Sequence, residues 1–288
     1  MIGVISHDAG GAEVLSSWIK ENPDNYSLLL GGPAKEIFQK KLYKQYPYIN
    51  DVADLIGCKQ TICSTGWQTD FEKKGILFSL KNSIYTTVFL DHWNFYLERF
   101  IYSGQELVPN EIKVPDIESK KIALKQLKCQ NITIYKNHYL NQSVDEILNL
   151  SRSVIHKKRV FLYLCDPIED FAREFGIDDD FWGYNEVDAL EFFLKNIASK
   201  SNSYDEIILR KHPSETYEKY EWALGGKVKF SKNKTLAEDI ANADTIFGCE
   251  TYALVVALKS GKDVFYSIPP GGRKSLIPYS IPYLRDQI

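Results

Sequence analysis

The first twenty residues, MIGVISHDAGGAEVLSSWIK (residues 1–20), decide the fold class. The apolar run at 1–5 has the length of a buried strand, and a glycine-rich stretch at 6–13 separates it from an amphipathic run at 14–20. Strand, turn and helix in this order begin a βαβ unit, in which the strands pair in parallel. The start of the chain therefore predicts an α/β protein.

The same alternation continues to the end of the chain. Further strands are predicted at 26–30, 61–63, 84–90, 111–114 and 132–135, and a second set at 160–164, 206–210, 228–230, 245–247 and 263–266. Helices are predicted at 34–46, 186–199, 236–241 and 252–259, and a polar helical stretch at 141–158 connects the two sets. We therefore expect two Rossmann-like lobes, an acceptor lobe at 1–150 and a nucleotide-binding lobe at 151–288, with a ligand cleft between them.

Composition narrows the classes of partner and site. The 288 residues carry a formal net charge of -3, whereas proteins that follow a nucleic-acid backbone usually carry a basic excess. The five cysteines form no CxxC pair and no leader precedes the first strand, so we expect reduced thiols and a cytoplasmic protein. The five histidines are scattered, which predicts no metal site, and the apolar runs are too short to span a membrane.

The loop after the strand at 206–210 contains the strongest constellation. Arg210, Lys211 and His212 stand at the carboxyl end of the strand, and Pro213 stiffens the exit. Such a loop can donate hydrogen bonds to a phosphate and neutralise a leaving group. The alternative is a solvated basic turn.

A second candidate lies where the strand at 245–247 leads into a helix. Gly248 ends the strand, and helix N-termini offer free N–H groups to an anion. Thr251 could cap the helix or bind a phosphate, whereas Glu250 would repel a phosphate but could accept from a ribose hydroxyl. The alternative is an ordinary capped core helix.

In the first lobe, residues 6–13 match neither GxGxxG nor the Walker A spacing, so no dinucleotide is expected. Gly10 and Gly11 permit close approach of a ligand to the backbone, and His7 or Asp8 could act as general base towards an acceptor hydroxyl. The alternative for Asp8 is a simple helix cap.

Three further groups are ambiguous. Trp67 follows a strand as a candidate substrate contact, with Thr69 and Glu72 spaced as in a capping box. Asp91 and His92 follow the strand at 84–90 and could form a base held by a carboxylate, or a buried polar structure. A lysine-rich helix face is expected to be solvated or, alternatively, to contact anionic lipid; it comprises Lys35, Lys40, Lys41 and Lys44.

Taken together, the motifs at 210–213, 248–251 and 257–264 resemble the C-terminal half of GT-B glycosyltransferases. The most similar families are sialyltransferases, polysialyltransferases and Kdo transferases of bacterial surface-polysaccharide clusters, and polymerases that use CDP-glycerol share a His-Pro loop. The resemblance implies that His212 contacts the phosphate of a CMP donor. Glu250 and Thr251 stand where those families have a hydroxyl pair, and Asp8 is the positional match for their carboxylate base.

The resulting expectation is a metal-independent, inverting glycosyltransferase of GT-B type. It would transfer a sugar from a nucleotide-activated donor, CMP-nonulosonate or Kdo ahead of a UDP-sugar, to a glycan acceptor. Asp8 would be the base, with His7 and His92 in reserve, and no cofactor beyond the donor is expected. The location would be cytoplasmic, with peripheral association at the inner face of the membrane as a further expectation; no pattern indicates the oligomeric state.

Three alternatives remain open at this point. A nucleotide-sugar hydrolase or 2-epimerase shares the two-lobed fold but uses no acceptor. A polyol-phosphate transferase would use CDP-glycerol. A non-catalytic accessory protein would bind a nucleotide or glycan without turnover.

Overall fold

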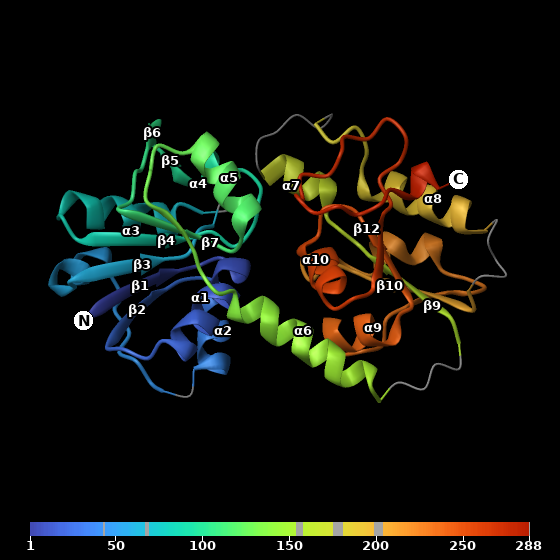
Figure 1. Ribbon diagram of the computed structural model, residues 1–288, viewed down its shortest axis with the longest axis horizontal. Helices are drawn as coiled ribbons and strands as arrows, with labels where there is room; N and C mark the ends of the chain where they lie inside the picture. The colour runs from blue at the N-terminus through green and yellow to red at the C-terminus, as the bar shows by residue number, and fades with distance from the viewer. Residues whose placement is uncertain (43, 67–68, 154–157, 175–180, 199–203, 288) are drawn as a thin grey trace. The chain divides into compact units, whose positions relative to one another are not determined.

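The computed structural model describes the whole chain except residues 43, 67–68, 154–157, 175–180, 199–203 and 288. It divides into two compact units, Met1–Tyr139 and Leu140–Ile288 (Figure 1). The boundary expected between residues 150 and 151 falls instead near the start of helix α6 (His138–Ser151). Residues Leu140–Ser151 of this helix therefore belong to the second unit, and Ile147 is its buried residue.

Six parallel strands form the sheet of the first unit, in the order β2-β1-β3-β4-β7-β8. Their bounds are Ile2–Ser6 (β1), Tyr26–Leu30 (β2), Gln60–Cys63 (β3), Tyr85–Phe89 (β4), Glu111–Val114 (β7) and Ile132–Ile134 (β8). The chain runs outward from β1 to β2 and then returns to β3 on the other side. The strand order therefore reverses between β1 and β3, which is where doubly wound sheets bind ligands.

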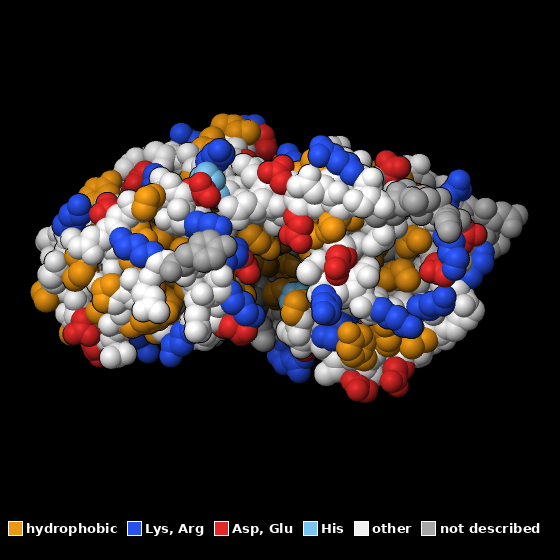
Figure 2. Space-filling model, turned by 90° about the horizontal axis from the view of Figure 1, so that it is seen from below, with side chains coloured by type: hydrophobic (Ala, Val, Ile, Leu, Met, Phe, Trp, Pro, Cys, Tyr) orange, Lys and Arg blue, Asp and Glu red, His pale blue; other side chains and the backbone are white. Residues whose placement is uncertain are grey.

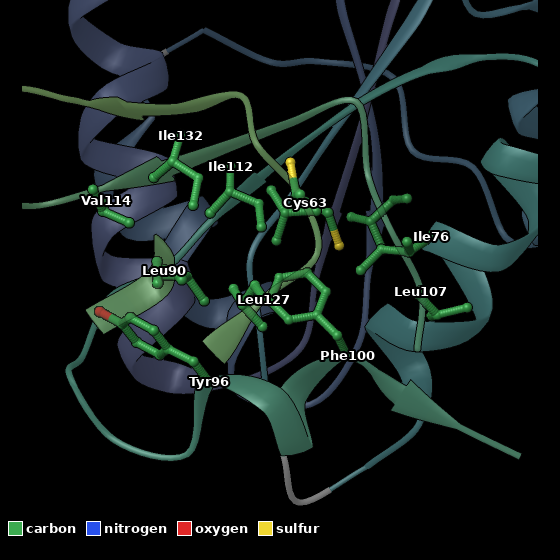
Figure 3. Packing of buried hydrophobic residues seen from close by; sticks show 14 of the residues in the cluster. Cys63, Ile76, Leu90, Tyr96, Phe100, Leu107, Ile112, Val114, Leu127 and Ile132 are labelled. Atoms are coloured by element: carbon green, nitrogen blue, oxygen red, sulfur yellow. The ribbon is translucent and has the colours of Figure 1, made fainter. Parts of the chain in front are cut away.

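Helices cover both faces of this sheet, because neighbouring strand residues alternate between two apolar clusters. Val4 packs with the cluster that includes α1 (Ala9–Glu21) and α2 (Ala34–Lys41), whereas Ile5 packs with the cluster beneath α3 (Phe71–Lys81) and α5 (Ile117–Gln126). Figure 3 shows the second cluster, in which side chains of the sheet and α3 meet Tyr96 and Phe100 of the short helix α4 (Tyr96–Phe100). Residues of η1 (Val52–Gly57) and β5 (Ile101–Tyr102) also pack against this cluster, and β5 pairs with β6 (Gln105–Glu106).

The second unit repeats the design with five parallel strands in the order β11-β10-β9-β12-β13. The strands are Val160–Leu164 (β9), Glu206–Arg210 (β10), Val228–Phe230 (β11), Thr245–Gly248 (β12) and Asp263–Tyr266 (β13). The order reverses between β9 and β12. The helices are Ile168–Glu174 (α7), Glu186–Ala198 (α8), Glu218–Ala223 (η3), Leu236–Asn242 (α9), Tyr252–Lys259 (α10) and Leu284–Asp286 (η4).

The structure shows a surface of mixed charge and cysteines without disulfide bonds. On the face shown in Figure 2, Lys and Arg side chains are interspersed with Asp and Glu side chains. Of the predicted lysine face on α2, Lys40 pairs with Glu36 at the exposed surface, whereas Lys41 is partly buried and joins α2 to α1 through Glu13 and Ser17. All five cysteines are buried and unpaired. Within the described residues, no helix is both long and apolar enough to cross a membrane.

Candidate functional site

The first candidate group lies at the carboxyl end of β1, beside the reversal of strand order. Asp8 follows β1 and caps α1, because its Oδ2 accepts a hydrogen bond of 3.1 Å from the Gly10 N–H. The structure therefore confirms the helix cap that the sequence offered as the alternative role of Asp8. It leaves the second carboxylate oxygen of Asp8 outside the cap.

Glu72 holds the loop that carries Asp8. Its Oε1 accepts from the backbone N–H groups of His7 (2.8 Å) and Asp8 (3.1 Å). The capping box expected from Thr69 and Glu72 is wrong, because the N-cap of α3 is Asp70, without a side-chain cap bond. The Glu72 side chain turns inward instead, and only 1% of its surface is exposed.

Asp91 and Arg99 complete this group. Arg99 Nη1 donates to Asp91 Oδ1 (2.8 Å) and to Thr65 Oγ1 (3.0 Å), so the guanidinium ties two strand-to-helix loops together. A methyl group at Gly10 would lie 2.5 Å from Asp91 Oδ2 and 3.6 Å from Asp8 Oδ2. Both carboxylates therefore lie against Gly10, and only glycine leaves room for them there.

Gly11, the other predicted glycine of this loop, also stands where a side chain would collide with its neighbours. A Cβ at Gly11 would stand 2.7 Å from Ser64 Cβ, so this glycine lets α1 approach the end of β3. Gly11 therefore contacts the protein itself. Trp67, the remaining expected substrate contact of this unit, lies outside the described residues.

The pKa of Asp8 is raised to about 6, first by burial and then by the neighbouring charge of Asp91, while Arg99 opposes the shift. The carboxylate is therefore mainly ionised at pH 7, yet it is a stronger base than an ordinary aspartate. This is the range suited to general-base catalysis near neutral pH.

The two reserve histidines are less suited to that role. The ring of His7 lies 5.5 Å from the ring of Phe71 and fills the space that Gly31 and Gly32 leave open. Burial lowers the pKa of His92 to about 4, so this side chain is neutral and weakly basic at pH 7. Among the candidates of this unit, Asp8 is the better base.

In the second unit, the loop after β10 orients His212. The backbone N–H of Ser214 donates to His212 Nδ1 (3.3 Å), and the Ser214 hydroxyl lies 2.7 Å from the same atom. An N–H can only donate, so Nδ1 is the acceptor and the neutral ring carries its proton on Nε2. Burial lowers the pKa of His212, Glu215 opposes this shift and Lys211 adds to it, and the net lowering favours the neutral donor.

The cations of this loop differ in their partners. Arg210 Nη1 pairs with the buried carboxylate of Asp239 (2.5 Å) and donates to the Thr235 carbonyl (3.1 Å). Arg210 therefore fastens the start of α9, which gives it a structural role that the sequence did not indicate. Lys211 lies over the ring of Tyr217 at 5.2 Å and donates to the His212 carbonyl. Pro213 lies between His212 and Ser214.

Two carboxyl groups, those of Asp166 and Glu250, lie where the strand order reverses between β9 and β12. Asp166, two residues after β9, accepts a 2.8 Å bond from the Glu250 N–H. Both Glu250 carboxyl oxygens accept from the Leu276 N–H (3.2 and 3.3 Å), and Thr251 caps α10 through the Ala253 N–H. Gly248 lets β12 lie close to β9, because a Cβ there would be tightly placed at 3.1 Å from the Leu164 carbonyl oxygen.

Burial changes the charge of this pair. It raises the pKa of Glu250 to about 8 and that of Asp166 to about 7. Glu250 is therefore mainly protonated at pH 7, and a neutral carboxyl group does not repel a phosphate as the sequence had suggested. Asp166 was missed, although a carboxylate two residues after the predicted strand at 160–164 was the signal that could have found it.

No metal-binding group stands out in the described part of the chain: no three His, Cys, Asp or Glu side chains are arranged to hold an ion. Residues 67–68 and the other undescribed segments lie outside this search.

Comparison with known proteins adds the fold but no family. No family model and no curated protein matches the sequence. Among solved structures, UDP-GlcNAc 2-epimerase from Neisseria meningitidis bound to UDP-GlcNAc shares 10% identity at a TM-score of 0.63, over 92% of this chain and 82% of that one. The 2-epimerase from Methanocaldococcus jannaschii shares 13% identity at 0.61, over 92% and 83%. The glycosyltransferase of kitacinnamycin shares 10% identity at 0.52, over 92% and 79%.

These identities are low and the likeness concerns the fold. The strand orders and the similar structures agree on an α/β protein with two Rossmann-like units of GT-B type, so the fold class expected from the sequence is confirmed.

Proposed function

We propose that this chain is an enzyme that acts on a nucleotide sugar, with Asp8 as its general base. The observation that carries the proposal is the position of Asp8 at the end of β1, where its carboxylate and that of Asp91 lie together against Gly10. Support comes from the fold, which is shared with enzymes named for UDP-GlcNAc and for glycosyl transfer.

Glycosyl transfer is the reaction we favour. As the acceptor oxygen bonds to the anomeric carbon, Asp8 takes its proton, and the bond between that carbon and the donor phosphate breaks. Attack from the face opposite the phosphate inverts the anomeric centre. A base with a pKa near 6 is ionised at pH 7 and still gains from accepting the proton.

Groups of the second unit would stabilise the departing phosphate. His212 offers an Nε2–H donor without a charge, Lys211 offers a cation, and the start of α10 at Thr251 offers a positive dipole end. Neutral Glu250 would accept from or donate to a ribose hydroxyl. We assign the neutralisation of the phosphate to these groups, so the proposed reaction proceeds without a divalent cation.

A second candidate function is 2-epimerisation or hydrolysis of the nucleotide sugar. The names of the two epimerases, which have higher TM-scores than the glycosyltransferase, favour it. They also favour a uridine nucleotide, whereas the His-Pro resemblance favours CMP. Both reactions would use Asp8, but neither needs an acceptor.

Product analysis separates these functions. The protein is incubated with UDP-N-acetylglucosamine, UDP-glucose or CMP-N-acetylneuraminic acid, with and without an oligosaccharide acceptor, and products are followed by proton NMR. Nucleotide release that depends on the acceptor supports transfer. Acceptor-independent release of sugar or a new epimer signal supports the second candidate, and binding without any product refutes both in favour of an accessory protein.

A further inference from the structure

The loop that carries His212 rests on a buried carboxylate, that of Glu215, which stands two residues after Pro213. The Glu215 side chain is fully buried, and its cationic partner is Lys219 of η3, whose side chain is 26% exposed. Neither residue was among the site residues expected from the sequence. A buried carboxylate is tolerated where hydrogen bonds and an opposite charge compensate for its lost hydration, and Glu215 has both.

Glu215 and His212 exchange two hydrogen bonds. The His212 N–H donates to Glu215 Oε2 (3.2 Å), and the Glu215 N–H donates to the His212 carbonyl (3.0 Å). This pair closes the turn at 212–215 and fixes the backbone of His212. Ser214 faces Nδ1 of the ring, and the ring of Phe171 in α7 lies edge-on to it, with centroids 6.3 Å apart. The Nε2–H group of His212 therefore has a defined direction.

The other oxygen of Glu215 is anchored to η3. The Tyr220 hydroxyl donates to Glu215 Oε1 (2.6 Å), and Lys219 Nζ lies 2.9 Å from the same atom. Tyr220 is fully buried, and Lys219 also pairs with Glu186, the first residue of α8. Glu215 is therefore tied to packed elements outside the loop, and its carboxylate connects them to the backbone of His212.

This connection depends on a carboxylate, because both oxygens of Glu215 accept: one from the loop and the other from η3. An amide accepts at one atom and donates at the other. In either orientation, a glutamine would turn its NH2 group towards a donor, either the His212 N–H or the Lys219 ammonium. Glu215→Gln has nearly the same size as the native residue, so it should weaken the connection without leaving a cavity.

We infer that Glu215 is a positioning residue, which holds the loop after β10 so that His212 directs its Nε2–H group at the phosphate of the donor. The holding of the loop follows from the contacts of Glu215, whereas the phosphate rests on the proposed function. On this account Glu215 affects the ligand through His212.

Hydrogen exchange of backbone amides, followed by NMR without ligand, tests the holding of the loop. In Glu215→Gln the His212 amide should exchange about 10-fold faster, as the loss of one hydrogen bond implies, and the amide of buried Leu209 in β10 should not change. A purely structural role would accelerate exchange of both amides together. Glu221→Gln, on the exposed surface of η3, removes the same charge and is the matched control, which should change neither amide.

Tyr220→Phe provides a milder variant, which keeps the buried ring and removes one donor to Glu215 Oε1. It should accelerate exchange of the His212 amide about 3-fold, again without a change at Leu209. If Glu215→Gln does not fold, Tyr220→Phe serves in both tests.

A double-mutant cycle on the affinity for UDP and CMP, measured by calorimetric titration, tests the connection to the ligand. Glu215→Gln should weaken binding about 10-fold in the wild-type background and should have no further effect in His212→Ala, because it acts through that side chain. An equal loss in both backgrounds, or an unchanged exchange rate of the His212 amide, overturns the inference.

The two measurements also separate this inference from the proposed function. If neither UDP nor CMP binds the wild type although the His212 amide responds as expected, the proposed function fails and Glu215 remains the residue that holds the loop. If a nucleotide binds but Glu215→Gln changes neither its affinity nor the exchange of the His212 amide, the positioning role fails and the proposed function stands.

Discussion

Replacing Asp8 by asparagine should remove the base and keep the fold. The amide oxygen of asparagine can accept the Gly10 N–H that Asp8 Oδ2 accepts now, and asparagine caps helices as well as aspartate does. The change also removes a buried carboxylate that faces Asp91. The free energy of unfolding should therefore change by no more than about 1 kcal/mol.

The loss of activity should be much larger. General-base catalysis contributes about 10²–10⁴-fold, so kcat/KM of Asp8→Asn should fall by about that factor. Because Asp8 must be ionised to act, the wild-type rate should rise with pH through about 6 and then level off. The residual rate of Asp8→Asn should lack this rise.

The assay measures nucleotide release between pH 5 and 8, with urea denaturation of each variant alongside. Asp145→Asn, on the exposed surface of α6, is the control and should behave as the wild type. A folded Asp8→Asn protein that retains the wild-type rate, or an unchanged pH profile, would refute the role of Asp8.

Three further predictions test other parts of the account. Ser214→Ala should raise the pKa of His212, read from ¹⁵N chemical shifts, because the hydroxyl at 2.7 Å from Nδ1 no longer stabilises the neutral ring, while the backbone N–H of residue 214 keeps the proton on Nε2; Ser214→Thr should restore the pKa, and an unchanged pKa in Ser214→Ala would contradict the assigned role of the hydroxyl. Arg99→Met should lower the free energy of unfolding by about 3–5 kcal/mol in urea, because it leaves the Asp91 carboxylate without its buried partner; a loss below about 1 kcal/mol would argue against that pair. The pKa of Glu250 is about 8 in the folded protein and near 4.5 in the unfolded chain, so its contribution to the free energy of unfolding is full below pH 4.5 and is lost as the pH rises to 8. The loss amounts to about 1.4 kcal/mol for each unit of pH in that range. Glu250→Gln should flatten this decline, and a parallel decline in both proteins would count against a raised pKa of Glu250.

Much of the sheet could be predicted because its strands are short apolar runs. The strands at 26–30, 111–114, 160–164, 206–210, 228–230 and 263–266 match the structure to the residue. Helices α3 and α5 were missed because their buried faces lack the apolar periodicity on which helix prediction depends. Towards the core α3 presents Glu72, Gly75, Ile76 and Ser79, and α5 presents Ser119 and Ala123.

Some residues of the candidate site could be predicted from the sequence and others could not. Asp8 and Asp91 could be proposed because each stands two residues beyond the carboxyl end of a strand, where parallel sheets present side chains to ligands. Glu72 and Arg99 could not, because their roles depend on partners from other loops: Glu72 lies 64 residues from Asp8 in the sequence. Spacing along the chain carries no signal of such contacts. The partner of Arg210 was hidden for the same reason, since Asp239 lies on a different helix.

The central claim, that this chain acts on a nucleotide sugar, requires a nucleotide to bind beside His212, and thermal unfolding with UDP, CMP, CDP and GDP tests this requirement most directly. A nucleotide at ~100 times its Kd adds about 2.7 kcal/mol to the free energy of unfolding, which raises Tm by several degrees. We expect UDP or CMP to raise the Tm of the wild type and to lose most of this effect in His212→Ala. If no nucleotide shifts the wild type, or if His212→Ala responds equally, the nucleotide site proposed here is contradicted.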